Sequence, residues 1–150
     1  MGRDFYEAFA TAREVFEEAS DLLSQNMREL IFEGPADMLS QTKHSQPAIF
    51  ITSVAILKTV EREFPHLAPT VCAGLSLGEY TALFAARKIA FPECLMLVAA
   101  RGTYMQEACQ ERAGTMRVVL GMEPSEVKKN LPADVWIANL NCPGQVVIAG

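Results

Sequence analysis

The sequence lacks the basic charge excess and the long apolar runs that would point to nucleic acid or to a membrane. Its 13 Lys and Arg residues are outnumbered by 18 Asp and Glu residues, giving a net charge of −5. Phosphate backbones are bound by basic faces, so nucleic acid is excluded as an expected partner. The longest apolar run, residues 94–100, is far below the roughly 20 residues of a membrane-spanning helix. We expect no membrane association.

Cysteine and histidine are also scarce and scattered. The chain has 4 cysteines in no CxxC pair and 2 histidines, which argues against a zinc site. The first residues do not show the basic stretch followed by an apolar stretch that is typical of a signal peptide, so we expect none there. Unclustered cysteines without such a signal are typical of a reducing compartment, and we expect a cytoplasmic protein without a bound metal.

Apolar periodicity and breaker residues predict a chain of mixed helix and strand. The predicted helices span residues 5–23, 27–32, 46–60, 77–86, 92–109 and 123–131, with a single turn at 37–39. The predicted strands span residues 70–74, 115–121, 135–139 and 145–149, with a turn at 141–144. Pro47 is placed at the first turn of its helix, where the missing N–H has no carbonyl partner in any case.

Two strands suggest that the chain is part of a larger domain. Within the strand predicted at 70–74, residues 71–74 are apolar on both faces, as in a parallel sheet covered by helices, yet no neighbouring strand is predicted beside them. The sequence also ends on an apolar strand at 146–150, whereas free termini are normally polar. A small, irregular but complete domain is the alternative.

The most informative segment is GxSxG at residues 74–78, between a predicted strand and a predicted helix. A serine at such a turn projects from the sheet edge, and Gly74 and Gly78 allow the strand and the helix to approach closely. The N–H of Leu77 can then face a developing oxyanion. Ser76 is therefore a candidate nucleophile, with a glycine-rich turn without chemistry as the alternative.

An ordinary esterase would carry its acid and histidine after the nucleophile in chain order. No histidine follows Ser76, and both His44 and His66 precede it in polar or linker segments. We expect neither to be the catalytic base, so the base of a catalytic Ser76 would be missing from this chain.

Arg101 interrupts an apolar helical stripe within residues 92–109. A buried arginine is costly unless it is paired. Either its stem follows the apolar surface towards a local carboxylate, or its planar fork binds the carboxylate of a ligand. Physical reasoning alone favours the structural role.

Several motifs together resemble the malonyl-CoA:acyl-carrier-protein transacylase family. Residues 74–80 (GLSLGEY) resemble its GHSLGE(Y/F) signature, and residues 101–106 (RGTYMQ) resemble its RGxxMQ segment. Further matches, in the same order along the chain, are residues 1–5, 46–48 (QPA), 114–121 and 139–150 (NLNCPGQVVIAG). Jointly these motifs are specific and extend over essentially all 150 residues.

The resemblance implies an α/β fold. Residues 1–113 would be part of an α/β-hydrolase-like core with a nucleophile elbow, and residues 114–150 would begin a ferredoxin-like subdomain. It implies transfer of a malonyl group from coenzyme A to acyl carrier protein in fatty acid biosynthesis, through a malonyl-serine ester. Malonyl-CoA and acyl carrier protein, which carries the phosphopantetheine, would be the partners, and no cofactor would be needed.

The resemblance also assigns roles to residues. Ser76 would be the nucleophile, the N–H of Leu77 would supply half of the oxyanion hole, and Arg101 would pair with the malonyl carboxylate. The more weakly implied pocket residues are Gln46, Met105, and Asn139 or Asn141. Because acyl carrier proteins are acidic, exposed basic pairs are candidate docking sites or simply solvated charges. These pairs are Arg87 with Lys88, and Lys128 with Lys129.

Three departures from the family pattern set the competing hypotheses. The family's N-terminal GQGSQ loop and its catalytic histidine have no counterpart here, and Leu75 stands where histidine is usual beside the nucleophile. We therefore expect this chain alone to have little or no transacylase activity. A catalytically silent fragment or an acyl-carrier-protein-binding module is one alternative. A serine esterase or thioesterase is the other, and Arg101 argues against it.

Overall fold

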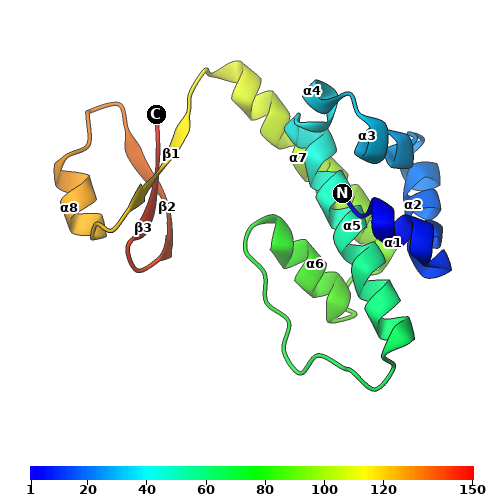
Figure 1. The fold of residues 1–150 in the computed structure, drawn as a ribbon. Coiled ribbons are helices and arrows are strands. Elements are labelled where there is room, and N and C mark those ends of the chain that lie inside the picture. The colour runs from blue at the N-terminus through cyan, green and yellow to red at the C-terminus, as the bar shows by residue number, and fades with distance from the viewer. The chain divides into compact units, whose positions relative to one another are not determined.

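Helices and one small antiparallel sheet make up the structure of residues 1–150, which is a computed structural model (Figure 1). The chain divides into two units, Met1–Glu107 and Ala108–Gly150, and the division falls inside α7. The helices are α1 (Arg3–Ala8), α2 (Ala10–Leu23), α3 (Met27–Glu33), α4 (Ala36–Leu39), α5 (Thr42–Glu63), α6 (Leu77–Ala85), α7 (Phe91–Glu111) and α8 (Pro124–Lys129). The mixture of helix and sheet agrees with the predicted α/β class. None of these helices is both long enough and apolar enough to cross a membrane.

The helix predicted over residues 5–23 is wrong in one respect, because it is two helices. Phe9 is extended, with φ −123° and ψ 125°, and separates α1 from α2. Arg13 in α2 donates to the carbonyl oxygens of Tyr6 and Glu7, each at 3.0 Å. These bonds satisfy carbonyl groups that the end of α1 leaves without helical partners.

The prediction that Pro47 opens its helix is also wrong, since α5 begins at Thr42 and contains Pro47 in its interior. The extra first turn is held by α7. The side-chain oxygen of Gln106 accepts a hydrogen bond of 2.9 Å from the N–H of Thr42. A Cβ on Gly102 would stand 2.9 Å from the carbonyl oxygen of Thr42, so glycine allows α7 to approach α5 there. Pro47 removes one helical hydrogen bond, and the contact with α7 holds the turn that precedes it.

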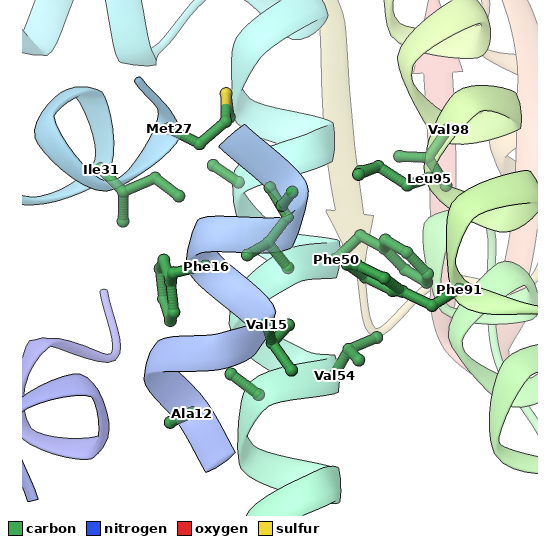
Figure 2. Close-up of a cluster of buried hydrophobic side chains, with 14 of the residues drawn as sticks. Ala12, Val15, Phe16, Met27, Ile31, Phe50, Val54, Phe91, Leu95 and Val98 are labelled. Carbon is green, nitrogen blue, oxygen red and sulfur yellow. The ribbon is translucent and has the colours of Figure 1, made fainter. Parts of the chain in front are cut away.

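The core of the first unit lies between α2, α5 and α7 (Figure 2). Phe50 of α5 is fully buried and stacks on Phe91 of α7 with ring centroids 5.9 Å apart. Phe84 of α6 meets the Phe50 ring edge-on at 6.3 Å. Aromatic pairs in these geometries add about 1 kcal/mol each to the free energy gained by burial. The other fully buried large side chains here are Phe16, Met27, Ile51, Leu95, Val54, Val98 and Cys94.

The predicted strand at residues 70–74 is absent. This segment is irregular, and its Val71 side chain is 82% exposed. A strand is held by hydrogen bonds to a neighbouring strand, and the unit Met1–Glu107 contains none. The remaining helix predictions of this unit, around 27–32, 37–39, 77–86 and 92–109, are confirmed within a few residues.

The second unit contains β1 (Met116–Leu120), α8, β2 (Trp136–Cys142) and β3 (Gln145–Ala149). The sheet order is β1-β3-β2, and both pairings are antiparallel. The three predicted strands and the short helix are confirmed. The turn predicted at 141–144 is shorter, because β2 continues through Cys142 and leaves only Pro143 and Gly144, which has φ 73°.

Candidate functional site

Ser76 stands at a strained turn directly before α6. Its backbone has φ 55° and ψ −112°, a conformation that residues other than glycine rarely adopt. The N–H of Gly78 donates to the carbonyl of Leu75 at 2.9 Å, and the N–H of Glu79 to that of Ser76 at 3.2 Å, which closes the turn. Ser76 is exposed. The turn predicted from GxSxG is thus formed even though no strand precedes it.

The first glycine of this motif is required by close backbone contact. A Cβ on Gly74 would stand 2.0 Å from the carbonyl oxygen of Gly78 and 2.5 Å from the nitrogen of Glu79. A Cβ on Gly78 would meet nothing within 4 Å. In this chain it is Gly74 alone whose lack of a side chain allows residues 74–76 to fold back against α6.

The N–H of Leu77 is the first of α6 and has no carbonyl partner within the helix. The partial positive charge at a helix N-terminus adds to this donor. Leu77 directly follows Ser76, so its N–H can stabilise negative charge on an oxygen that develops beside the serine. Its assignment as half of an oxyanion hole stays a prediction.

Arg101 reaches Ser76 from α7. Its Nη2 donates a hydrogen bond of 2.7 Å to Ser76 Oγ, and its guanidinium carbon lies 5.9 Å from the centre of the Tyr80 ring. The single salt bridge of the chain joins Arg3 to Glu33, so Arg101 has no carboxylate partner. The structural ion pair that the sequence left open is therefore not formed. A half-buried cation without a counter-ion lies beside the candidate nucleophile.

Gln46 and Met105 complete this group. Gln46 is buried at 6% exposure on α5, and its Oε1 accepts a hydrogen bond from Arg101 Nη1. Its Nε2 donates to Met105 Sδ at 3.1 Å. Four residues singled out in the sequence thus form one connected set, running from Ser76 through Arg101 and Gln46 to Met105. This set is hereafter called the serine–arginine cluster.

Asn139 and Asn141 lie on β2 in the other unit. Both are exposed, and Asn141 Nδ2 donates to Gln145 Oε1 at 2.9 Å across the hairpin of β2 and β3. That contact gives Asn141 a local structural role. A role for either asparagine in the pocket stays a prediction.

Neither histidine makes a hydrogen bond to Ser76. His44 lies on the first turns of α5, where burial and, to a lesser degree, the nearby Lys43 charge lower its pKa below 6.5. His66 meets the Phe64 ring edge-on, with centroids 6.4 Å apart. Ser76 has Arg101 as its one side-chain partner, and it has no imidazole partner.

Two residues of the site had no assigned role from the sequence. Tyr80 stands one helical turn after Ser76 and places its ring against the Arg101 guanidinium. Its carbonyl oxygen accepts from the buried thiol of Cys94 at 3.4 Å, and burial raises the pKa of that thiol. Gln106 fastens the start of α5 to α7. The four-residue spacing of Ser76 and Tyr80 was the available signal for the first, and the RGxxMQ segment at residues 101–106 was the signal for the second.

Residues 1–150 match the family described as "Acyl transferase domain". The chain is 40% identical to the malonyl CoA-acyl carrier protein transacylase of Bacillus subtilis strain 168, covering 100% of this chain and 49% of that relative. The Escherichia coli K12 protein of the same name is 38% identical over 100% of this chain and 50% of its own length. The chain spans about half the length of the curated relatives it matches.

Solved structures are similar to this chain in the same way, over about half of their length. The malonyl CoA-acyl carrier protein transacylase of Clostridium perfringens superposes with a TM-score of 0.88 at 39% identity, over 100% of this chain and 48% of its own. A malonyl-transacylase solved in complex with a type II PKS acyl-carrier protein superposes with a TM-score of 0.86 at 39% identity. The superposition covers 100% of this chain and 50% of the chain of that malonyl-transacylase.

Proposed function

Because this chain belongs to the acyl transferase domain family, we propose that it carries the nucleophile and the acid-binding arginine of a malonyl-CoA:acyl-carrier-protein transacylase of fatty acid biosynthesis. The observation that carries the proposal is the hydrogen bond of 2.7 Å from Arg101 Nη2 to Ser76 Oγ. It places a cation without a counter-ion at the atom that would attack the substrate.

In the first half-reaction, Ser76 Oγ attacks the thioester carbonyl of malonyl-CoA. A C–O bond forms, the C–S bond breaks, and coenzyme A leaves as a thiol that takes up the proton lost by the serine hydroxyl. The Leu77 N–H stabilises the negative charge on the carbonyl oxygen during the attack. The product is a malonyl ester on Ser76.

Arg101 accounts for the choice of a malonyl group. A malonyl group carries a free carboxylate at the end opposite its thioester, and a guanidinium binds a carboxylate through charge-assisted hydrogen bonds. In the loaded state the carboxylate replaces Ser76 Oγ as acceptor of Arg101 Nη2. A neutral acyl group offers no such acceptor, so an esterase for neutral esters is the weaker hypothesis.

In the second half-reaction, the phosphopantetheine thiol of acyl carrier protein attacks the Ser76 ester and regenerates the hydroxyl. Exchange among thioester, ester and thiol needs no metal or cofactor. The exposed pairs Arg87 with Lys88 and Lys128 with Lys129 are the docking candidates for this acidic partner. The 4 cysteines are free in the structure, which supports the cytoplasm as the place of this reaction.

We propose in addition that the two parts of the chain belong to two known kinds of fold. Residues 1–113 would contribute to an α/β-hydrolase-like core, which the strained serine turn before α6 supports. Residues 114–150 would begin a ferredoxin-like subdomain. The β-α-β-β succession with sheet order β1-β3-β2 supports this assignment.

Intact-mass spectrometry after long incubation with malonyl-CoA tests the proposal. We expect a single malonyl adduct on the wild-type chain and none on Ser76→Ala. Single loading is the appropriate readout because no histidine contacts Ser76. A chain that unfolds cooperatively but gains no adduct would favour the binding-module hypothesis, and an equal adduct on Ser76→Ala would exclude Ser76 as the nucleophile.

A further inference from the structure

The Gln46 side chain connects the Arg101 guanidinium with the Met105 thioether inside the serine–arginine cluster. It is buried at 6% exposure, and both ends of its amide are used. The orientation of this amide follows from chemistry. A guanidinium can only donate hydrogen bonds, so the carbonyl oxygen must face Arg101, and the NH₂ group is then directed at a sulfur that can only accept.

The backbone beneath Gln46 is held in place by α7. Gly102 allows that helix to approach until a Cβ would stand 2.9 Å from the Thr42 carbonyl oxygen, and Gln106 accepts from the Thr42 N–H. Gln46 lies one turn further along α5. Both partners of its amide, Arg101 and Met105, come from the same stretch of α7 as these two contacts.

The contact with Gln46 determines the direction in which the Arg101 guanidinium points. With Nη1 bound by Gln46, the nitrogen of Arg101 that remains for the nucleophile's side is Nη2. We propose that Gln46 is a positioning residue that turns the Arg101 fork so that Nη2 faces the acyl group on Ser76, and so sets the selectivity for acyl groups with a free carboxylate. This inference rests on the proposed function of the site.

Glutamine suits this role better than glutamate would. A neutral carbonyl oxygen orients the guanidinium and leaves its positive charge uncompensated. A glutamate at position 46 would form a permanent ion pair with Arg101 and compete with the ligand carboxylate. The proposal therefore predicts that an exchange of one NH₂ group for oxygen removes selectivity while the shape of the side chain is kept.

The test is equilibrium binding of malonyl-CoA and of acetyl-CoA to the full chain, measured by isothermal titration calorimetry. Wild type should prefer malonyl-CoA, and Gln46→Glu should reduce that preference at least about tenfold, as a lost charge-assisted pair would. Gln46→Met should reduce it less. Gln110→Met is the control for a glutamine-to-methionine exchange, since Gln110 is exposed on α7 and makes no contact with Arg101 or Gln46. It should leave the preference unchanged.

A second readout does not depend on variants. Nitrogen-15 NMR of arginine side chains should resolve separate Nη1 and Nη2 signals for Arg101 in the wild-type chain, because two fixed acceptors hinder rotation of the group. One averaged signal would overturn the inference. Retained malonyl preference in a folded Gln46→Glu would also overturn it while the proposed function stands. A wild-type chain with no preference would overturn the proposed function and the inference together.

Discussion

The backbone of Gly74 lies directly against the carbonyl group of Gly78, so that a Cβ on Gly74 would stand 2.0 Å from the carbonyl oxygen. The two ends of the serine turn are therefore in contact with no side chain between them. Because this contact joins residues within one short segment, the turn keeps its form without the strand that sequence patterning places before it.

The first prediction concerns these two glycines. Gly74→Ala should lower the free energy of unfolding by about 3 kcal/mol, because backbone atoms must move to admit the methyl group. Gly78→Ala should be neutral or should stabilise the chain by up to about 1 kcal/mol, since its Cβ meets nothing and alanine favours the helix. Urea denaturation of both variants measures the difference. Equal losses of unfolding free energy in the two variants would show that the close backbone contact at Gly74 does not require glycine.

The second prediction concerns the aromatic core. Phe50→Ala should cost about 4 kcal/mol, because a fully buried ring that stacks on Phe91 is replaced by a cavity. Its neighbour Ile49, which is 44% exposed, is the control, and Ile49→Ala should cost less than about 1 kcal/mol. Thermal and urea unfolding check both values. A cost for Phe50→Ala near that of Ile49→Ala would contradict the assigned core.

The third prediction keeps the charge at position 101 and changes its geometry. In Arg101→Lys a single ammonium cannot reach Ser76 Oγ and Gln46 Oε1 as the guanidinium fork does, so malonyl-CoA binding should weaken about tenfold. Arg28→Lys, an exposed change on α3 away from these contacts, should have no effect. Calorimetry on both variants decides whether charge alone is enough. Unchanged affinity in Arg101→Lys would mean that the fork is not needed.

The fourth prediction is a pH dependence at His44. Burial and the Lys43 charge lower its pKa in the folded chain, so between that value and 6.5 the unfolded chain binds more protons than the folded one. The His44 contribution to stability is thus present above pH 6.5 and is lost as the pH falls. His44→Asn should flatten the fall in stability between pH 7 and pH 5. A folded-state NMR titration midpoint at or above 6.5 would contradict this prediction.

Local patterning predicted the elements whose causes are local. The apolar period of α7, the short strands of the second unit and the GxSxG turn are each determined within a few residues. The start of α5 is not, because it depends on a hydrogen bond between Thr42 and Gln106, which are 64 positions apart. Likewise, the apolar period continues through Phe9 and gives no sign of the break between α1 and α2.

The site was predicted only in part, because some of its contacts are local in sequence and others join residues far apart. Ser76 and Leu77 follow from the motif alone. The contact between Arg101 and Gln46 joins residues 55 positions apart, and the bond between Gln46 and Met105 spans 59. The family resemblance pointed to these residues, but only the packing of α5 against α7 shows that Gln46 lies between Arg101 and Met105 and contacts both. The segment at 70–74 has the composition of a buried strand, but no neighbouring strand is there to hydrogen-bond with it, and it is irregular.

The positive φ of Ser76 also restricts which nucleophile the turn can hold. A β-branched residue is disfavoured in this backbone conformation, because its second branch crowds the main chain. Threonine, despite carrying the same hydroxyl, would have to distort the turn, whereas cysteine has the unbranched shape of serine and would fit. The backbone at this one position thus admits an exchange of oxygen for sulfur more readily than the addition of a single methyl group.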